Sequence, residues 1–151
     1  MTLTMLAEIA TVAVFVWGII TFRQDVTLRR ADHFGRVRND LVSNDKLAEL
    51  LHLVEHDDER LAGIDAPLKM TFVCVFEEVE LLRRAGLMKP ALAYYMFGQT
   101  AINCADSHHF WSGDFPRDED YWGLFFGFVA EMRELHRQKC SGEWSLEKIE
   151  V

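Results

Sequence analysis

The hydrophobic pattern of the chain begins with a long apolar run. Residues 3–22 carry one charged side chain, Glu8, and would form a helix of roughly 30 Å, the thickness of a bilayer core. A cleaved signal peptide would need cations before the run and a small-x-small cleavage site, but no Lys or Arg precedes it and it ends in ITFRQD. We therefore interpret residues 1–22 as a transmembrane helix rather than a signal peptide or a soluble core helix.

A charged segment follows the apolar run. It contains five arginines: Arg23, Arg29, Arg30, Arg36 and Arg38. The positive-inside rule then places the N-terminus outside and the rest of the chain in the cytosol. We expect Arg23, Arg29 and Arg30 to lie at the membrane interface, where they could contact anionic lipid head groups, although Asp25 and Asp32 weaken that contact. Residues 23–42 contain no Pro and only one Gly, which favours a juxtamembrane linker helix.

From residue 43 onward, apolar positions recur at helical spacing and are separated by residues that start and stop helices. Ser43–Asp45 can cap a helix, and the acidic stretch 56–67 after it predicts a solvated connection. Pro67 suits the first turn of the next helix, Gly86 its end, and Pro90 the start of another. The predicted apolar faces are Leu47, Leu50, Leu51 and Val54 in the first helix, and Met70, Phe72, Val73, Phe76 and Val79 in the second.

The last helix has the clearest pattern. Its apolar positions are Tyr121, Leu124, Phe125, Phe128, Met132 and Leu135. A long loop precedes it, and the aromatics Tyr94, Tyr95, Trp111, Phe115 and Trp122 are most simply explained as core. No strand-like alternation occurs, so we predict an all-α fold. A single N-terminal transmembrane helix continues into a small cytosolic helical bundle (43–140), and residues 141–151 form a tail.

Composition excludes some classes of function. The chain has 151 residues and a net charge of −8, which argues against sequence-specific binding of nucleic acid, because phosphate contacts need clustered cations. Its three cysteines show no CxxC spacing, so they indicate neither a disulfide framework nor a zinc site and fit a reducing cytosol.

Candidate catalytic and metal-binding residues are few. His52 and His56 are four residues apart with Glu55 between them, which could place two ligands on one helix face. No HExxH pattern completes the set, and the site would lie on an acidic surface, so we expect no metal centre and no cofactor. His108 and His109 are interpreted as a solvated pair in a loop. Because no nucleophile triad or phosphate loop is present, we do not expect an enzyme.

The strongest functional pattern lies in the predicted transmembrane helix. At 100° per residue, its small and polar residues fall on one stripe, opposite a uniformly aliphatic back. The stripe consists of Thr4, Ala7, Glu8, Thr11, Phe15, Gly18 and Phe22. Ionised Glu8 facing lipid would cost about 2–3 kcal/mol, and association of copies through the stripe would remove it from lipid.

Three interpretations of the stripe remain open. With two copies, the stripe would be a dimer seam. With four or more, it could line a pore with a ring of Glu8 carboxylates at its mouth, selective for cations, and with Phe15 as a hydrophobic constriction. Alternatively, Glu8 lies at the outer head groups and the helix is only an anchor.

Three segments of the chain carry a resemblance to known proteins: "RRADHFGRVRNDL", "FEEVELLRRAGLMKPALAYYMFG" and "DEDYWGLFFGFVAEM". With the N-terminal anchor, they resemble a bacterial family of uncharacterised one-pass membrane proteins that have cytosolic helical domains. This architecture is similar to that of small membrane effectors of antiviral defence. The resemblance implies a location in the bacterial inner membrane, a homo-oligomeric pore, and a cytosolic activating protein or signalling nucleotide that opens it.

The functional prediction is therefore an oligomeric membrane effector whose cytosolic domain receives a signal. The alternative is a membrane-tethered accessory or scaffold subunit of a larger complex that conducts nothing itself. A membrane-bound enzyme is a weaker third hypothesis.

Overall fold

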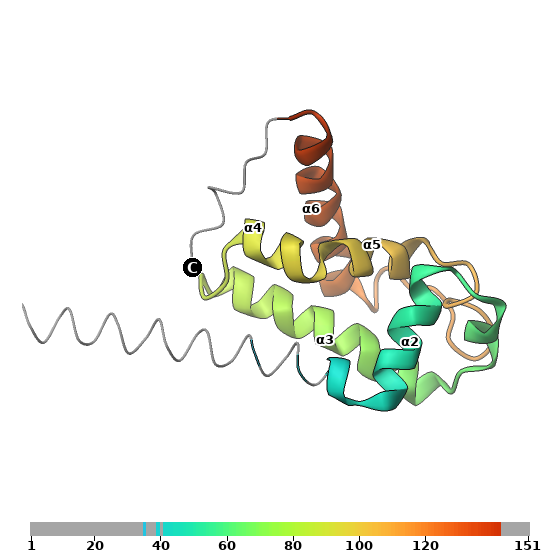
Figure 1. The fold of residues 1–151 in the computed structure, drawn as a ribbon. Helices are drawn as coiled ribbons and strands as arrows, with labels where there is room; N and C mark the ends of the chain where they lie inside the picture. The colour runs from blue at the N-terminus through green and yellow to red at the C-terminus, as the bar shows by residue number, and fades with distance from the viewer. Residues whose placement is uncertain (1–34, 36–38, 40, 143–151) are drawn as a thin grey trace, which may run out of the picture. The chain divides into compact units, whose positions relative to one another are not determined.

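The computed structural model describes residues 35, 39 and 41–142 (Figure 1). The chain divides into two units, Met1–Gly35 and Arg36–Val151, and the second contains nearly all of the described residues. Every regular element in these residues is helical, which confirms the predicted all-α class. None of the helices among residues 35, 39 and 41–142 is long and apolar enough to cross a bilayer, and the predicted transmembrane helix lies outside them.

The first element, α2 (Asp45–Glu55), begins at the predicted cap. The Asn44 side chain accepts hydrogen bonds from the backbone N–H groups of Lys46 and Leu47, which would otherwise lack partners. Its buried face is Leu47, Leu50, Leu53 and Val54. The prediction of Leu51 was wrong for this face: Leu53 takes the buried position and Leu51 is only half-buried, because the core lies slightly to one side of the predicted stripe.

The acidic stretch after α2 is more ordered than the predicted solvated connection. A 3₁₀ helix, η1 (Glu59–Gly63), is capped by Asp58, whose carboxylate accepts a hydrogen bond from the Arg60 N–H. One turn buries Leu61 completely. Leu61 therefore anchors this connection to the core.

Helix α3 (Ala66–Arg84) has the predicted start and stop. Pro67 lies in its first turn, and Gly86 adopts a φ of 68° just after its end. The Gly86 and Leu87 N–H groups donate to the carbonyls of Arg83 and Leu82, which closes the helix in the manner of a Schellman motif. Its buried residues are Lys69, Phe72, Val73, Phe76, Val79 and Glu80.

The predicted apolar face of α3 was wrong at one position. Met70 is 42% exposed, and Lys69 is buried in the turn where Met70 was expected. Residues 69, 72, 73 and 76 share one face at helical spacing, so the helix is rotated to carry the long methylene stem of Lys69 inward.

The segment that begins at Pro90 is one helical run with a wider turn inside it. It comprises α4 (Pro90–Ala93), a π-helical turn η2 (Tyr94–Gly98) and α5 (Gln99–Asp106), which Figure 1 shows in yellow and orange beside α3. A Cβ atom on Gly98 would lie 2.6 Å from Cδ2 of Tyr94, so only glycine leaves room for this buried ring.

The last helix, α6 (Gly123–Cys140), packs against α3 and α5, while α2 packs against α5 and α3. At the centre of the core, the Phe76 ring contacts those of Phe72, Phe125 and Phe128 at centroid distances of 5.2, 5.8 and 6.5 Å. Aromatic packing of this kind adds to the free energy gained by removing the rings from water.

The loop before α6 contributes to the same core. Trp111 and Phe115 are buried and stack at 5.4 Å, as expected of core aromatics, and Trp122 is buried beside them. Tyr94 is also buried. The prediction was wrong for Tyr95 and for Tyr121, which are 66% and 68% exposed.

Candidate functional site

The residues with the strongest sequence signal lie outside the described part of the chain. These are the stripe residues Thr4, Ala7, Glu8, Thr11, Phe15, Gly18 and Phe22, and the interface cations Arg23, Arg29 and Arg30. Their roles stay predictions.

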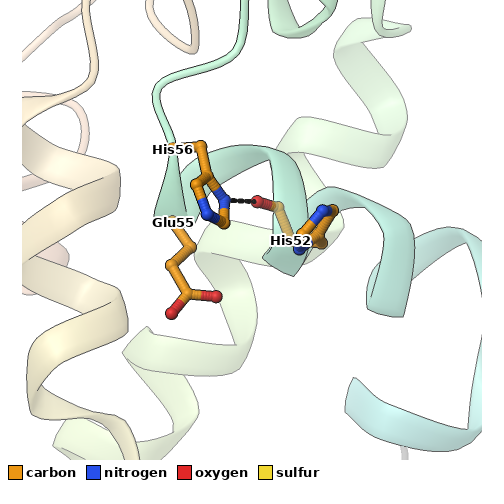
Figure 2. A group of neighbouring side chains, drawn as sticks. All are labelled: His52, Glu55 and His56. Carbon is orange, nitrogen blue, oxygen red and sulfur yellow. Dashed lines mark hydrogen bonds between the residues drawn. The ribbon is translucent and has the colours of Figure 1, made fainter.

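Within the helical domain, three potential metal ligands lie together at the end of α2. We call His52, Glu55 and His56 the histidine–glutamate cluster. Each offers one ligand atom, and these atoms all lie within 4.8 Å of one another. All three side chains are exposed, and Figure 2 shows them on the last turn of the helix, with the His56 ring turned toward the His52 carbonyl. The spacing i, i+3, i+4 places them on one helix face.

The local fold explains the position of His56. The His56 N–H bonds to the Leu53 carbonyl, which leaves the His52 carbonyl without its usual backbone donor. Nδ1 of His56 lies 3.0 Å from that carbonyl oxygen. Because a carbonyl can only accept, Nδ1 carries the proton in this bond and Nε2 keeps a free lone pair. The bond closes the helix end and at the same time selects the tautomer.

The chain directly after the cluster is fixed by Asp57. This residue has a φ of 46°, in the left-handed region that Asp tolerates better than most side chains. Its Oδ1 accepts hydrogen bonds from Ser107 Oγ at 2.5 Å and from the His109 N–H at 3.3 Å. Burial raises the pKa of Asp57, but the hydrogen bonds from Ser107 and the backbone outweigh it and hold the pKa below its ordinary value.

Ser107 continues this connection into the core. It is buried, and its Oγ also accepts a hydrogen bond from the Phe110 N–H at 3.0 Å. The end of α2 is therefore tied, through Asp57 and Ser107, to the aromatic loop that precedes α6.

A second group of charged side chains lies between α3 and α6. We call Glu80, Arg83, Arg84 and Glu131 the Glu80 cluster. The Glu80 carboxylate is fully buried and accepts hydrogen bonds from Nε of Arg83 and Nε of Arg84, both at 2.7 Å. Arg83 also bonds to Glu131 of α6 at 2.8 Å.

The electrostatics of the Glu80 cluster favour the ionised carboxylate. Burial raises the pKa of Glu80, but the two arginines donate hydrogen bonds to the carboxylate and add their charge, so that its pKa lies below the ordinary value. Glu80 and Arg84 are four residues apart on α3, the spacing at which glutamate and arginine pair on one helix face, but no local pattern indicates that Glu80 is buried. Every oxygen of Glu80 already has a donor, which indicates a structural role.

A buried lysine lies deeper in the core. The Lys69 ammonium donates to the Ser112 carbonyl at 3.4 Å and lies 5.6 Å from the centroid of the Phe110 ring. Burial lowers the pKa of Lys69 and raises that of the Cys104 thiol well above its ordinary value. The burial of Lys69 was not predicted from the sequence. Lys69 precedes Phe72 by three residues and Val73 by four, and this spacing places it on their buried helix face.

A cavity of about 780 Å³ opens where η1 and the start of α3 meet the loop around Phe115. Lys46 lines it together with Asp65 and Asp114, so its charged groups are of both signs. No single class of ligand is favoured by such a lining.

A third cluster links α6 to the π-helical turn. Tyr94 Oη lies 2.9 Å from Nδ1 of His136, and Nε2 of His136 lies 3.7 Å from Sγ of Cys140. A thiol beside an oriented imidazole is one element of thiol nucleophile sites. None of these residues lines the cavity described above, however, and Cys140 is exposed at the helix end.

Comparison of the chain with protein-family models, with curated proteins and with solved structures found no match. Among the described clusters, the histidine–glutamate cluster is fully exposed, and the bond from Nδ1 of His56 to the His52 carbonyl leaves the other ring nitrogen of His56 accessible.

Proposed function

We propose that the chain is a membrane-anchored, self-associating effector: its N-terminal helix lines a gated cation pore, and its helical domain receives the opening signal. The observation that carries the proposal is the sequence pattern of the predicted N-terminal helix, in which Thr4, Glu8, Thr11, Phe15 and Gly18 fall on one stripe. A lone anchor gains nothing from such a stripe, whereas several copies remove Glu8 from lipid by associating through it.

Two features of the helical domain support a role as receiver. Residues 41–142 bury a core of their own, so the domain can hold a defined conformation beside the membrane. Leu41, where the predicted linker joins the domain, is only 3% exposed, and α2 starts a few residues later. We expect a change at α2 to reach the linker through this short segment, which Leu41 anchors to the core.

The experiment is conductance of the purified full-length protein in planar bilayers, with a membrane-potential dye in cells. We expect Phe15→Ala to conduct without a stimulus, because it removes the hydrophobic constriction. Glu8→Gln should lower selectivity for cations over chloride without preventing assembly. Val16→Ala, on the opposite face, is the matched control and should behave like wild type. If neither wild type nor Phe15→Ala ever conducts, the pore is refuted.

The pathway that we propose is bacterial antiviral defence, and this part rests only on the resemblance in architecture. Activation by a cytosolic protein or a signalling nucleotide belongs to the same proposal.

A second candidate function is a tethered scaffold subunit without conduction. Exposed Tyr95 and Tyr121 favour it, because tyrosine is enriched at protein interfaces. The two functions differ in one measurement. A scaffold would form oligomers that Gly18→Leu disturbs more than Ile20→Leu, seen by mass photometry in detergent, while every variant stays non-conducting.

A further inference from the structure

We propose that His52, Glu55 and His56 bind a divalent cation of the zinc class at the end of α2. This inference is independent of the proposed membrane function, since it rests only on described side chains. It also revises the expectation from sequence that no metal is bound, which depended on the absence of an HExxH motif and on the acidic surface around the site.

The distances are within reach of a coordination sphere. Zinc binds histidine nitrogen and carboxylate oxygen at about 2.0–2.2 Å, so two ligands of a tetrahedral site stand about 3.3 Å apart. The ligand atoms of the cluster already lie within 4.8 Å of one another. The side chains are exposed, and small rotations about their side-chain torsions can close the remaining gap without moving the backbone.

The hydrogen bond of His56 prepares the site. Histidines that bind metals commonly donate their second ring N–H to a carbonyl or carboxylate, which fixes the tautomer and the ring orientation. His56 makes such a bond from Nδ1 to the His52 carbonyl, and Nε2 is left for the metal. Helix capping alone would explain the hydrogen bond of His56. Capping does not, however, require the side chains of His52 and Glu55 beside it.

Of the three neighbouring carboxylates, those of Asp57 and Asp58 are already hydrogen-bonded, and that of Glu55 is available to bind a metal. Asp57 is held by Ser107 and the His109 N–H, and Asp58 pairs with Arg60 at 2.9 Å. Glu55 makes no such contact with the described residues, so its carboxylate is available to complete the site. The nearby acidic side chains further favour a bound cation through their summed negative charge.

The donor set selects the class of metal. Imidazole nitrogens favour zinc and its transition-metal neighbours, whereas magnesium and calcium prefer oxygen ligands only. Two histidines and one glutamate are also a known three-ligand set for zinc, which leaves a fourth position for water or another ligand. We therefore expect Zn²⁺ to bind and Mg²⁺ not to compete with it.

The test is a Zn²⁺ titration of the full-length protein in detergent, after treatment with a chelator, by calorimetry or against a chromophoric chelator. We expect one Zn²⁺ per chain at this site. His52→Gln and Glu55→Gln should each weaken its binding, His52→Gln by about tenfold or more. His52→Gln is the sharpest variant because it keeps the His56 hydrogen bond to the backbone carbonyl. Circular dichroism without metal checks that each variant is folded.

Two controls separate this site from other zinc ligands in the chain. His108→Gln removes an exposed histidine outside the cluster, and Cys140→Ser removes the thiol beside His136. Both should bind Zn²⁺ at this site as wild type does, and Co²⁺ bound there should show no thiolate charge-transfer band. The proposal is overturned if His52→Gln and Glu55→Gln bind Zn²⁺ as wild type does, or if Cys140→Ser or His108→Gln abolishes the binding.

Discussion

Charged side chains have opposite environments at the end of α2 and at the interface between α3 and α6. At the interface, Glu80 is fully buried and both of its oxygens accept hydrogen bonds from arginine. At the end of α2, His52, Glu55 and His56 are exposed and share one helix face. The first arrangement pairs the Glu80 carboxylate with two arginines of its own helix, and Arg83 also links α3 to Glu131 of α6. The second keeps ligand atoms accessible to solvent, as a binding site requires.

The largest effect is expected in the core beside the Glu80 cluster. Phe76→Ala removes a fully buried ring that contacts three other phenylalanines, so we expect a loss of about 3–5 kcal/mol in the free energy of unfolding. Denaturation by urea, followed by tryptophan fluorescence, measures it. Tyr95→Ala is the control and should change stability by less than about 0.5 kcal/mol, because this ring is mostly exposed. Equal losses would contradict the assignment of the core.

Removing the buried carboxylate should come next. Glu80→Ala leaves two arginine side chains without their acceptor, and we expect it to lower the free energy of unfolding by about 3 kcal/mol. Glu131→Ala breaks only the pair with Arg83 on a side chain that is 47% exposed, and its loss should stay below about 1 kcal/mol. A Glu80→Ala protein as stable as Glu131→Ala would show that the buried carboxylate does not stabilise the domain.

Acid should remove the contribution of Glu80. Its folded pKa is held below the ordinary value, so the ionised carboxylate stabilises the fold above the unfolded pKa, and this stabilisation is lost as the pH falls through the folded pKa. We expect wild type to be more stable than Glu80→Gln at neutral pH, with the difference shrinking below about pH 4.3. Urea denaturation at a series of pH values measures the difference. A difference that is constant with pH would argue against a depressed pKa.

A smaller effect is expected where the end of α2 is tied to the core. Ser107→Ala removes both the bond to Asp57 and the bond to the Phe110 N–H, and should cost about 1–2 kcal/mol. Ser141→Ala removes an exposed hydroxyl that donates to Gln138 at the end of α6, and should be close to neutral. Thermal unfolding of the two variants in parallel compares them. A neutral Ser107→Ala would mean that Asp57 does not anchor α2.

The smallest effect on stability is expected in the histidine–glutamate cluster itself. Without metal, His52→Gln should change the free energy of unfolding by less than about 0.5 kcal/mol, because the side chain is exposed. With Zn²⁺, wild type should gain stability and His52→Gln should not, since only a folded site binds. The unfolding temperature with and without Zn²⁺ measures this, and His108→Gln should gain as much as wild type. Stabilisation that is equal in His52→Gln would place the metal elsewhere.

Much of the helical order follows from local signals. Asn44 caps α2 through its side chain, Pro67 lies in the first turn of α3 and Gly86 ends it with a positive φ, and each of these residues acts on the backbone next to it. The burial of Leu61 and the exposure of Met70 depend instead on which elements pack together, and no local pattern contains that information.

The shared helix face of the candidate site is predictable from the sequence, whereas the hydrogen bond that orients it is not. The spacing of His52, Glu55 and His56 indicates a shared helix face, yet the hydrogen bond from His56 to a vacant carbonyl depends on how the helix ends. The contact of Tyr94 with His136 joins residues far apart in the chain, so no spacing rule could predict it.

The buried thiol of Cys104 can report transient opening of this domain. Cys74 and Cys140 are exposed, whereas Cys104 is fully buried and its thiol pKa is raised well above the ordinary value. Reagents that modify thiolates therefore reach two cysteines from the folded surface and the third only when α5 separates from its neighbours. The rate of Cys104 modification therefore measures how often α5 opens transiently in the native protein. No residue has to be changed for this measurement.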